Sequence, residues 1–199
     1  NANDARAALT ELLSRAGPSP RVFVVAYSYG CYVLADLVYQ ERAAGRERLL
    51  MALALISPVT ASPYDGQPLY LNLRDVLQTW TKPALLLAGE HDEYSWPQRL
   101  HGLTVSLTAP TANYSIVPGA GHFYRQLGTA ERVGSLVAAF VRTQAAAAGA
   151  AGGDSASQSS AALLRALAPH DDFVLPPLAA GVLPGVLAVL LLSLSVVVG

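Results

Sequence analysis

The stretch that decides the fold is residues 21–32, which read RVFVVAYSYGCY. Residues 22–26 are apolar and rich in β-branched side chains, which suits a strand that is buried on both faces. Residues 27–30 fit a tight turn, and from Cys31 onward the apolar residues recur at a helical spacing. A strand, a sharp turn that holds Ser28, and a helix are the local context of a nucleophile elbow, which lifts a serine hydroxyl above the sheet edge.

Two small residues flank Ser28 where the strand and the helix must pass closely. Ala26 lies two residues before it and Gly30 two residues after it. Because a helix N-terminus favours negative charge, the backbone N–H of Tyr29 is a candidate donor to an oxyanion. The alternative is an ordinary strand–helix loop that happens to contain serine and glycine, because the pattern is short.

The composition of the 199-residue chain narrows the possible classes of protein. One domain with a sizeable core is expected, since 52% of the residues are hydrophobic. The 13 basic and 14 acidic side chains nearly cancel, so no basic surface indicates nucleic-acid binding. Cys31 is the single cysteine, which excludes intrachain disulfides and Cys-rich zinc sites. The chain begins with Asn1, so it is expected to be a fragment or a processed product.

Apolar runs that alternate with helical periods predict a parallel sheet with flanking helices, an α/β fold. Strands are predicted at residues 22–26, 49–56, 84–88 and 112–117. Helices are predicted at residues 4–16, 74–79 and 129–142, and from Cys31 up to Gly45. The fourth strand alternates most, as expected near a sheet edge. Residues 57–72 are rich in Pro, Ser, Gly and Tyr and are interpreted as a loop over the edge where the strands end.

Three candidate catalytic side chains each follow a predicted strand. Ser28 follows the first strand, Asp92 lies in the polar loop after the third, and His122 lies in the turn after the fourth. Because the carboxyl ends of parallel strands meet at one edge, we expect these side chains to lie close together. A histidine can take the proton of a serine hydroxyl, and an acid can fix the imidazole tautomer and stabilise the imidazolium.

Other residues compete for these roles. Glu90 and Glu93 flank Asp92 and are rivals for the acid, and Asp92 can equally be a surface carboxylate. His122 can be a solvated turn histidine. The remaining histidines are expected to be solvated: His91, His101 and His170. Cys31 is interpreted as a buried small hydrophobic residue on the elbow helix rather than as a nucleophile.

Four motifs in this order resemble the α/β-hydrolase superfamily. They are AYSYGCYVLADL (residues 26–37), LALISPV (53–59), PALLLAGEHDEYSWP (83–97) and IVPGAGHFY (116–124). Over residues 21–142 the chain is similar, more narrowly, to small dienelactone-hydrolase-like and Xaa-Pro-peptidase-like α/β-hydrolases. The resemblance implies Ser28 as the nucleophile, Asp92 as the acid and His122 as the base, in the chain order that these enzymes use.

The sequence therefore predicts the C-terminal part of an α/β-hydrolase fold. The expected function is hydrolysis of an ester or related acyl bond of a small molecule through an acyl-enzyme on Ser28, without a metal or organic cofactor. A peptidase or an acyltransferase on the same residues is the alternative among enzymes, and a non-catalytic, membrane-tethered binding domain is the alternative outside them. Ala26 stands where the family often has glycine. The family's N-terminal strands and the loop with the second oxyanion donor are absent from this sequence.

The composition changes abruptly after Arg142 and divides the chain into three parts. Residues 1–142 are the predicted hydrolase domain, residues 143–172 an Ala/Gly/Ser-rich linker without fixed structure, and residues 173–199 an uncharged hydrophobic tail. A helix over residues 178–198, at about 1.5 Å per residue, is long enough to cross a bilayer core of about 30 Å. The tail is therefore expected to be a transmembrane anchor, with a lipid-anchor attachment signal as the alternative. Membrane association through this tail is expected, with the hydrolase domain in the cytoplasm or an organelle.

Overall fold

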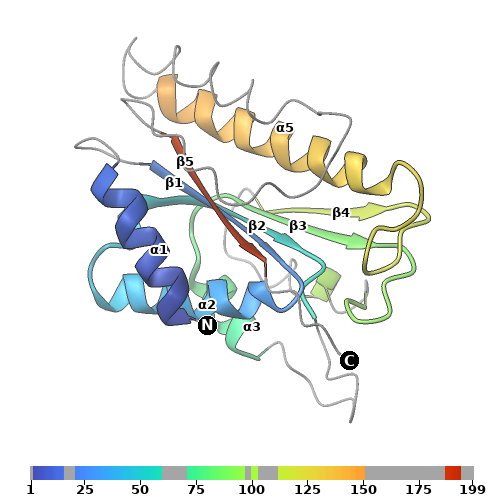
Figure 1. Cartoon of the computed structure of the whole chain (residues 1–199), viewed down its shortest axis with the longest axis horizontal. Coiled ribbons are helices and arrows are strands. Elements are labelled where there is room, and N and C mark those ends of the chain that lie inside the picture. The colour runs from blue at the N-terminus through green and yellow to red at the C-terminus, as the bar shows by residue number, and fades with distance from the viewer. Residues whose placement is uncertain are drawn as a thin grey trace.

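A computed structural model of the chain has one parallel sheet with helices on both faces (Figure 1). The structure describes residues 2–15, 21–59, 71–96, 100–102, 112–150 and 187–193. The strands are β1 (Arg21–Tyr27), β2 (Leu50–Ile56), β3 (Ala84–Gly89), β4 (Ala112–Val117) and β5 (Leu187–Ser193). The helices are α1 (Ala2–Arg15), α2 (Gly30–Ala43), the 3-10 helix η1 (Glu47–Leu49), α3 (Leu71–Thr79) and α5 (Thr129–Ala150). The strand order is β4-β3-β2-β1-β5, and each neighbouring pair is parallel.

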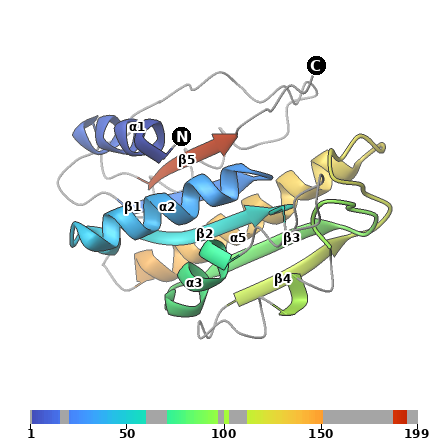
Figure 2. The ribbon, with the colours of Figure 1, turned by 90° about the horizontal axis from the view of Figure 1, so that it is seen from below.

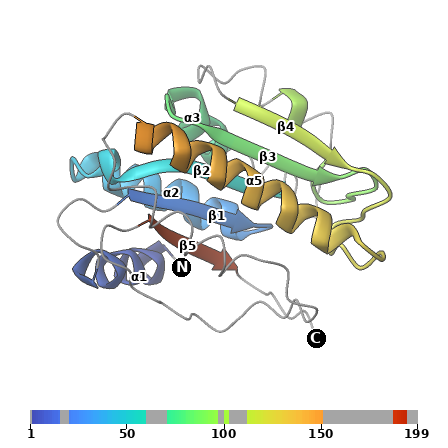
Figure 3. The same ribbon diagram turned by 90° about the horizontal axis from the view of Figure 1, so that it is seen from above.

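Side chains along the central strands alternate between two cores, one on each face of the sheet. On one face, Val24 of β1 and Leu55 of β2 are buried in a core with residues of α1, α2 and α3. On the other face, Phe23 of β1 and Leu87 of β3 are buried with Phe140 of α5. Figure 2 shows the first face, with α1, α2 and α3 in front, and Figure 3 shows α5 lying across the second. Two covered faces explain why these strands are continuous apolar runs rather than alternating ones.

The four strands predicted from the sequence are confirmed, and β4 lies at an edge as its alternation predicts. The predicted end of the last helix is wrong. The sequence pattern predicts that this helix ends at Arg142 and that a linker begins at residue 143, whereas α5 continues to Ala150. Alanine has the highest helix propensity, and residues 145–148 are four consecutive alanines, so the helix extends through them. Residues 151–172 of the predicted linker lie outside the described residues.

The C-terminal segment contains a strand where a membrane-spanning helix is expected. Leu187–Ser193 forms β5 and pairs with β1 over its whole length, from Arg21↔Leu187 to Tyr27↔Ser193. The helix expected over residues 178–198 is therefore wrong for this segment, and the rest of the tail lies outside the described residues. A short apolar run suits a buried parallel strand and a buried helix equally by periodicity, so the pattern alone does not decide between them. In the part of the chain that the structure describes, no helix combines the length and the apolar character needed to cross a membrane.

Removing β5 is expected to destabilise the domain, because it leaves the hydrogen-bonding edge of β1 unpaired. Deletion of residues 187–199 should cost about 2 kcal/mol or more, if each lost backbone hydrogen bond contributes about 0.5–1.5 kcal/mol. For a domain of this size that loss corresponds to a decrease in Tm of about 4–8 °C. Thermal unfolding followed by circular dichroism measures it, with deletion of residues 194–199 as the control that keeps β5. An unchanged Tm in the longer deletion, together with loss of membrane retention on carbonate extraction, would favour the anchor instead.

Candidate active site

Ser28 occupies the turn between β1 and α2 with a backbone φ of 54°. Its N–H donates to the Ile56 carbonyl at the end of β2 (2.8 Å), and its own carbonyl accepts from the Cys31 N–H (3.1 Å). A positive φ in a residue other than glycine is strained, and such strain collects at functional turns. Ala26 and Gly30 on either side are both buried. The sequence thus forms a sharp elbow at the carboxyl edge of the sheet.

Asp92 lies in the loop after β3, and its side chain is fully buried. Its Oδ1 accepts backbone hydrogen bonds from Tyr94 (3.0 Å) and Ser95 (2.8 Å), which fix the carboxylate within its own loop. Burial raises the pKa of this carboxyl group, but the hydrogen bonds from His122, Ser57 and the Ser95 N–H, together with the interaction with His122, outweigh it, so the net pKa lies below its usual value. The carboxyl group is therefore ionised at neutral pH.

His122 lies in the turn after β4, and its ring is almost completely buried. The turn is joined to the acid loop because the His91 N–H donates to the Ala120 carbonyl (2.9 Å). The Tyr27 hydroxyl at the end of β1 donates to the carbonyl of His122 itself (2.9 Å). The ring of Tyr94 packs edge-on against the imidazole, with 4.8 Å between ring centroids. Groups from the acid loop and from the end of β1 therefore hold the imidazole in one orientation.

These three side chains form one hydrogen-bonded row. Ser28 Oγ is 2.8 Å from His122 Nε2, and His122 Nδ1 is 2.8 Å from Asp92 Oδ1. An ionised carboxylate can only accept, so Nδ1 carries a proton and donates it to Asp92. In the neutral ring Nε2 then has a lone pair, and the serine hydroxyl donates to it. A row of this kind is chemically able to generate a serine alkoxide and to stabilise the resulting imidazolium.

The other candidates from the sequence lie elsewhere. Glu90 and Glu93 are exposed, and among the described residues neither hydrogen bonds to the imidazole of His122. Glu90 instead accepts from the Gly119 N–H (2.8 Å). His91 and His101 are exposed as predicted. Cys31 is buried with no exposed surface, which agrees with its interpretation as a small hydrophobic residue, and burial raises its pKa. His170 lies outside the described residues.

Tyr29 is the residue before α2, at the end of the helix where negative charge is favoured. Its backbone N–H makes no hydrogen bond to another described residue. An oxyanion bound beside Ser28 can therefore accept from it without displacing any of the described residues. No group of three or more His, Cys, Asp or Glu side chains in the described residues is arranged to hold a metal ion.

Two hydroxyl groups beside Asp92, those of Ser57 and Tyr124, are not predicted from the sequence. The Ser57 hydroxyl donates to Asp92 Oδ2 (2.5 Å) and lies 2.7 Å from the Tyr124 hydroxyl. Both residues stand in the motifs quoted above, in SPV after β2 and in GHFY after β4. The position of Ser57 in the sequence could have indicated its place, because it directly follows a buried strand, as Ser28 does, and so lies at the same sheet edge.

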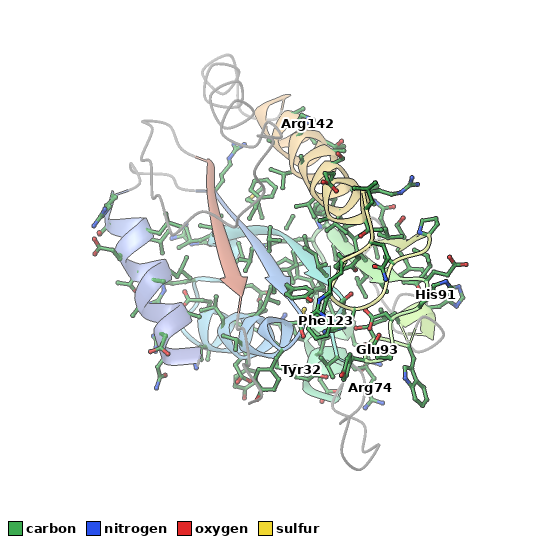
Figure 4. All side chains as sticks on the ribbon, turned by 45° about the vertical axis from the view of Figure 1, so that its right-hand side comes forward. Tyr32, Arg74, His91, Glu93, Phe123 and Arg142 are labelled. Carbon is green, nitrogen blue, oxygen red and sulfur yellow. The ribbon has the colours of Figure 1, made fainter. Side chains whose placement is uncertain are left out.

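Aromatic side chains gather around the row. Tyr29 and Phe123, the immediate neighbours of Ser28 and His122, are 48% and 54% exposed, and Trp96 is 46% exposed. Tyr32 of α2 contacts the ring of Tyr29, with 5.5 Å between centroids. Figure 4 shows Tyr32, Glu93 and Phe123 gathered on the side where β1 ends, far from Arg142 of α5. Exposed aromatic rings therefore adjoin Ser28 and His122.

No protein-family model matches the sequence, and no curated protein matches it. The structure is similar to the esterase domain of a Rhodothermus marinus protein, with 22% sequence identity and a TM-score of 0.55 over 72% of this chain and 68% of that chain. It is also similar to Est1E from Butyrivibrio proteoclasticus, with 17% identity and a TM-score of 0.54 over 70% of this chain and 67% of that chain.

A third solved structure, the monoacylglycerol lipase of Paleococcus ferrophilus, has 14% identity and a TM-score of 0.52 over 69% of this chain and 73% of that chain. These similarities show the fold: the chain has an α/β-hydrolase fold, as its motifs predict. At such identities they show the fold alone. The narrower similarity to dienelactone-hydrolase-like and Xaa-Pro-peptidase-like enzymes stays a prediction.

Proposed function

We propose that the protein is a serine hydrolase that cleaves an ester or related acyl bond. In this proposal Ser28 is the nucleophile, His122 the general base and then acid, and Asp92 the carboxylate that orients and stabilises the imidazolium. The observation that carries the proposal is the row of two 2.8 Å hydrogen bonds that joins these residues at the carboxyl edge of a parallel sheet. The esterase domain and the lipase of similar fold support the same class of reaction.

The first half of the reaction forms an acyl-enzyme. Ser28 Oγ attacks the carbonyl carbon of the substrate while its proton passes to His122 Nε2, and the carbonyl oxygen becomes an oxyanion. The backbone N–H of Tyr29 donates to this oxyanion. When the carbonyl re-forms, the bond to the leaving group breaks, and the imidazolium gives its proton to the departing oxygen. The products of this half are an alcohol and the ester of Ser28.

The second half releases the acid. Water attacks the Ser28 ester as His122 takes one of its protons, and the resulting oxyanion again lies beside Tyr29 N–H. The Ser28 oxygen then leaves and recovers its proton from the imidazolium, so the enzyme returns to its starting state. Asp92 stays ionised throughout, because its charge stabilises the imidazolium in both halves.

An ester with an apolar or aromatic part is the substrate class that the surroundings favour. Two exposed rings, Tyr29 and Phe123, adjoin the residues that would do the chemistry. Burying exposed aromatic surface against an apolar group is favourable at about 25 cal/mol per Å². The exposed Arg125 guanidinium lies 4.9 Å from the Phe123 ring centroid and adds a positive charge beside this ring.

Labelling with a fluorophosphonate probe tests the proposal. The probe reacts with activated serine hydroxyls, so the parent chain should be labelled at Ser28, and Ser28→Ala should abolish the labelling. Ser135→Ala is the matched control, since this exposed serine lies on α5, and its labelling should equal that of the parent. Peptide mass spectrometry locates the adduct. Labelling that persists in Ser28→Ala at another serine, or a parent that is not labelled at all, would reject the proposal.

A further inference from the structure

We propose that Ser57 and Tyr124 are positioning residues that form a hydroxyl relay, with Tyr124 donating to Ser57 and Ser57 donating to the acid Asp92. The inference rests on the proposed function for its effect on rate, but its geometry and its main measurement do not require turnover. The relay joins three loops, after β2, β3 and β4, behind the row of Ser28, His122 and Asp92.

Ser57 is held where its hydroxyl must face the acid. It has no exposed surface, and its backbone has a φ of 46°, the same strained region that Ser28 occupies. Its N–H donates to the Leu87 carbonyl of β3 (2.7 Å), which fixes the backbone against the neighbouring strand. The positive φ turns the chain at the end of β2. The structure therefore maintains a second strained serine beside the first, with its hydroxyl 2.5 Å from Asp92 Oδ2.

Counting protons fixes the direction of the relay. A serine hydroxyl has one proton, and an ionised carboxylate can only accept a hydrogen bond. Ser57 must therefore donate its proton to Asp92. The 2.7 Å contact between Ser57 and Tyr124 is then a hydrogen bond only if the phenol is the donor. Tyr124 is suited to that role, because burial and the charge of Asp92 raise its pKa and keep its proton in place. The chain of donors runs from Tyr124 to Ser57 to Asp92.

The relay supplies the hydrogen bond to Asp92 Oδ2, which accepts from no other group among the described residues. Oδ1 already accepts from His122 and from the backbone N–H groups of Tyr94 and Ser95. Oδ2 accepts from Ser57. A buried carboxylate oxygen without a donor is costly, and the carboxylate would then rotate or take up a proton. Either change disturbs the bond from Oδ1 to His122, so Ser57 and Tyr124 act on the imidazole through Asp92.

The titratable and charged groups around this carboxylate define what else can influence it. Within the described residues, His122 acts on Asp92 directly, the charge of Asp92 acts on Tyr27 and Tyr124, and Glu93, Arg125 and Cys31 act in turn on Tyr27. Tyr27 donates to the His122 carbonyl, and burial, followed by the charge of Asp92, raises its pKa to about 12. Tyr27 is therefore neutral at working pH. The charge of Asp92 is stabilised by the relay, by His122 and by the backbone N–H groups of Tyr94 and Ser95.

Ser57→Gly and Tyr124→Phe test the relay in the full chain. Glycine removes the hydroxyl but tolerates the positive φ, so it separates loss of the donor from backbone strain. Phenylalanine removes only the phenol oxygen. The main readout is the carbon-13 NMR titration of the Asp92 carboxyl group, which needs no turnover. We expect its pKa to rise in Ser57→Gly and to rise less in Tyr124→Phe, because Tyr124 acts through Ser57.

The double variant gives the sharper result. If the donors act in series, Tyr124→Phe should add nothing to the Asp92 titration once Ser57 is glycine. For hydrolysis of a short p-nitrophenyl ester, kcat should fall about 10-fold to 100-fold in Ser57→Gly with little change in KM, as expected when a transition-state interaction is lost. An unchanged Asp92 titration in Ser57→Gly, or additive effects in the double variant, would overturn the relay.

Two further outcomes stay decisive. If Ser57→Gly does not fold, Tyr124→Phe alone decides: a raised pKa of Asp92 supports the relay, and an unchanged one rejects it. If the parent chain lacks hydrolase activity, the proposed function is rejected. The NMR titration of Asp92 still tests the relay, because it does not depend on turnover. The two proposals can therefore fail separately.

Discussion

Replacing Asp92 with asparagine is expected to lower kcat about 10⁴-fold, the loss known for the equivalent change in a serine protease. Asp92 Oδ1 accepts from His122 Nδ1 and from the N–H groups of Tyr94 and Ser95. An asparagine can keep these bonds only by placing its amide oxygen there, and its NH₂ group then faces Ser57. The ring stays oriented, but no charge remains to stabilise the imidazolium. Steady-state hydrolysis of a p-nitrophenyl ester by the variant and the parent measures the loss.

Glu90→Gln and Glu93→Gln are the matched controls for this prediction. Both remove a carboxylate charge from the same loop, but both glutamates are exposed and neither hydrogen bonds to His122. Their kcat values should stay within about two-fold of the parent, since exposed charges are strongly screened. A near-normal rate in Asp92→Asn with a large loss in either glutamine variant would transfer the role of the acid.

The sequence was sufficient to locate the three loops that meet at the site. Continuous apolar runs predicted buried parallel strands, and parallel strands bring their carboxyl ends to one edge. Ser28, Asp92 and His122 each come soon after such a run, so their proximity follows from topology and needs no knowledge of side-chain packing. The structure also pairs His122 with Asp92, as the sequence predicts, and not with Glu90 or Glu93. Asp92 lies inside the turn, bonded to two N–H groups, while its neighbours face solvent.

The contacts that depend on tertiary packing could not be predicted in this way. Nothing in the local pattern says that the hydroxyl of Ser57 meets that of Tyr124, because the two lie 67 positions apart and approach only when β2, β3 and β4 align. The strand β5 could not be predicted from the local sequence pattern either. An uncharged apolar run has no period that distinguishes a strand from a helix, and only its pairing with β1 makes the assignment.

Replacing Gly89 with alanine is expected to damage both the site and the fold. Gly89 ends β3, and a Cβ built there would lie 2.8 Å from the carbonyl carbon of Ala120 and closer still to its oxygen. These are backbone atoms of the turn that carries His122, so they cannot move aside as a flexible side chain can. The turn must therefore shift away from the acid loop. The hydrogen bonds from Glu90 N–H to Val117 and from His91 N–H to Ala120 would be strained with it.

Such a shift separates His122 from Asp92, although neither residue is changed. A displacement of about 1 Å in a catalytic group can cost about 10²-fold in rate, and overpacking of this kind typically costs about 1–3 kcal/mol of stability. At the upper end the Tm of a chain of this size falls by about 6–12 °C. The measurements are kcat for ester hydrolysis and thermal unfolding followed by circular dichroism.

Gly102→Ala is the matched control, because a Cβ at Gly102 meets nothing within 4 Å. The same chemical change should there leave both kcat and Tm close to those of the parent, within about 0.5 kcal/mol in stability. If Gly89→Ala behaves like Gly102→Ala, the acid loop and the histidine turn are not in tight contact. The alignment of His122 with Asp92 would then have to come from the hydrogen bonds of their side chains alone, and not from the contact of their two loops at Gly89.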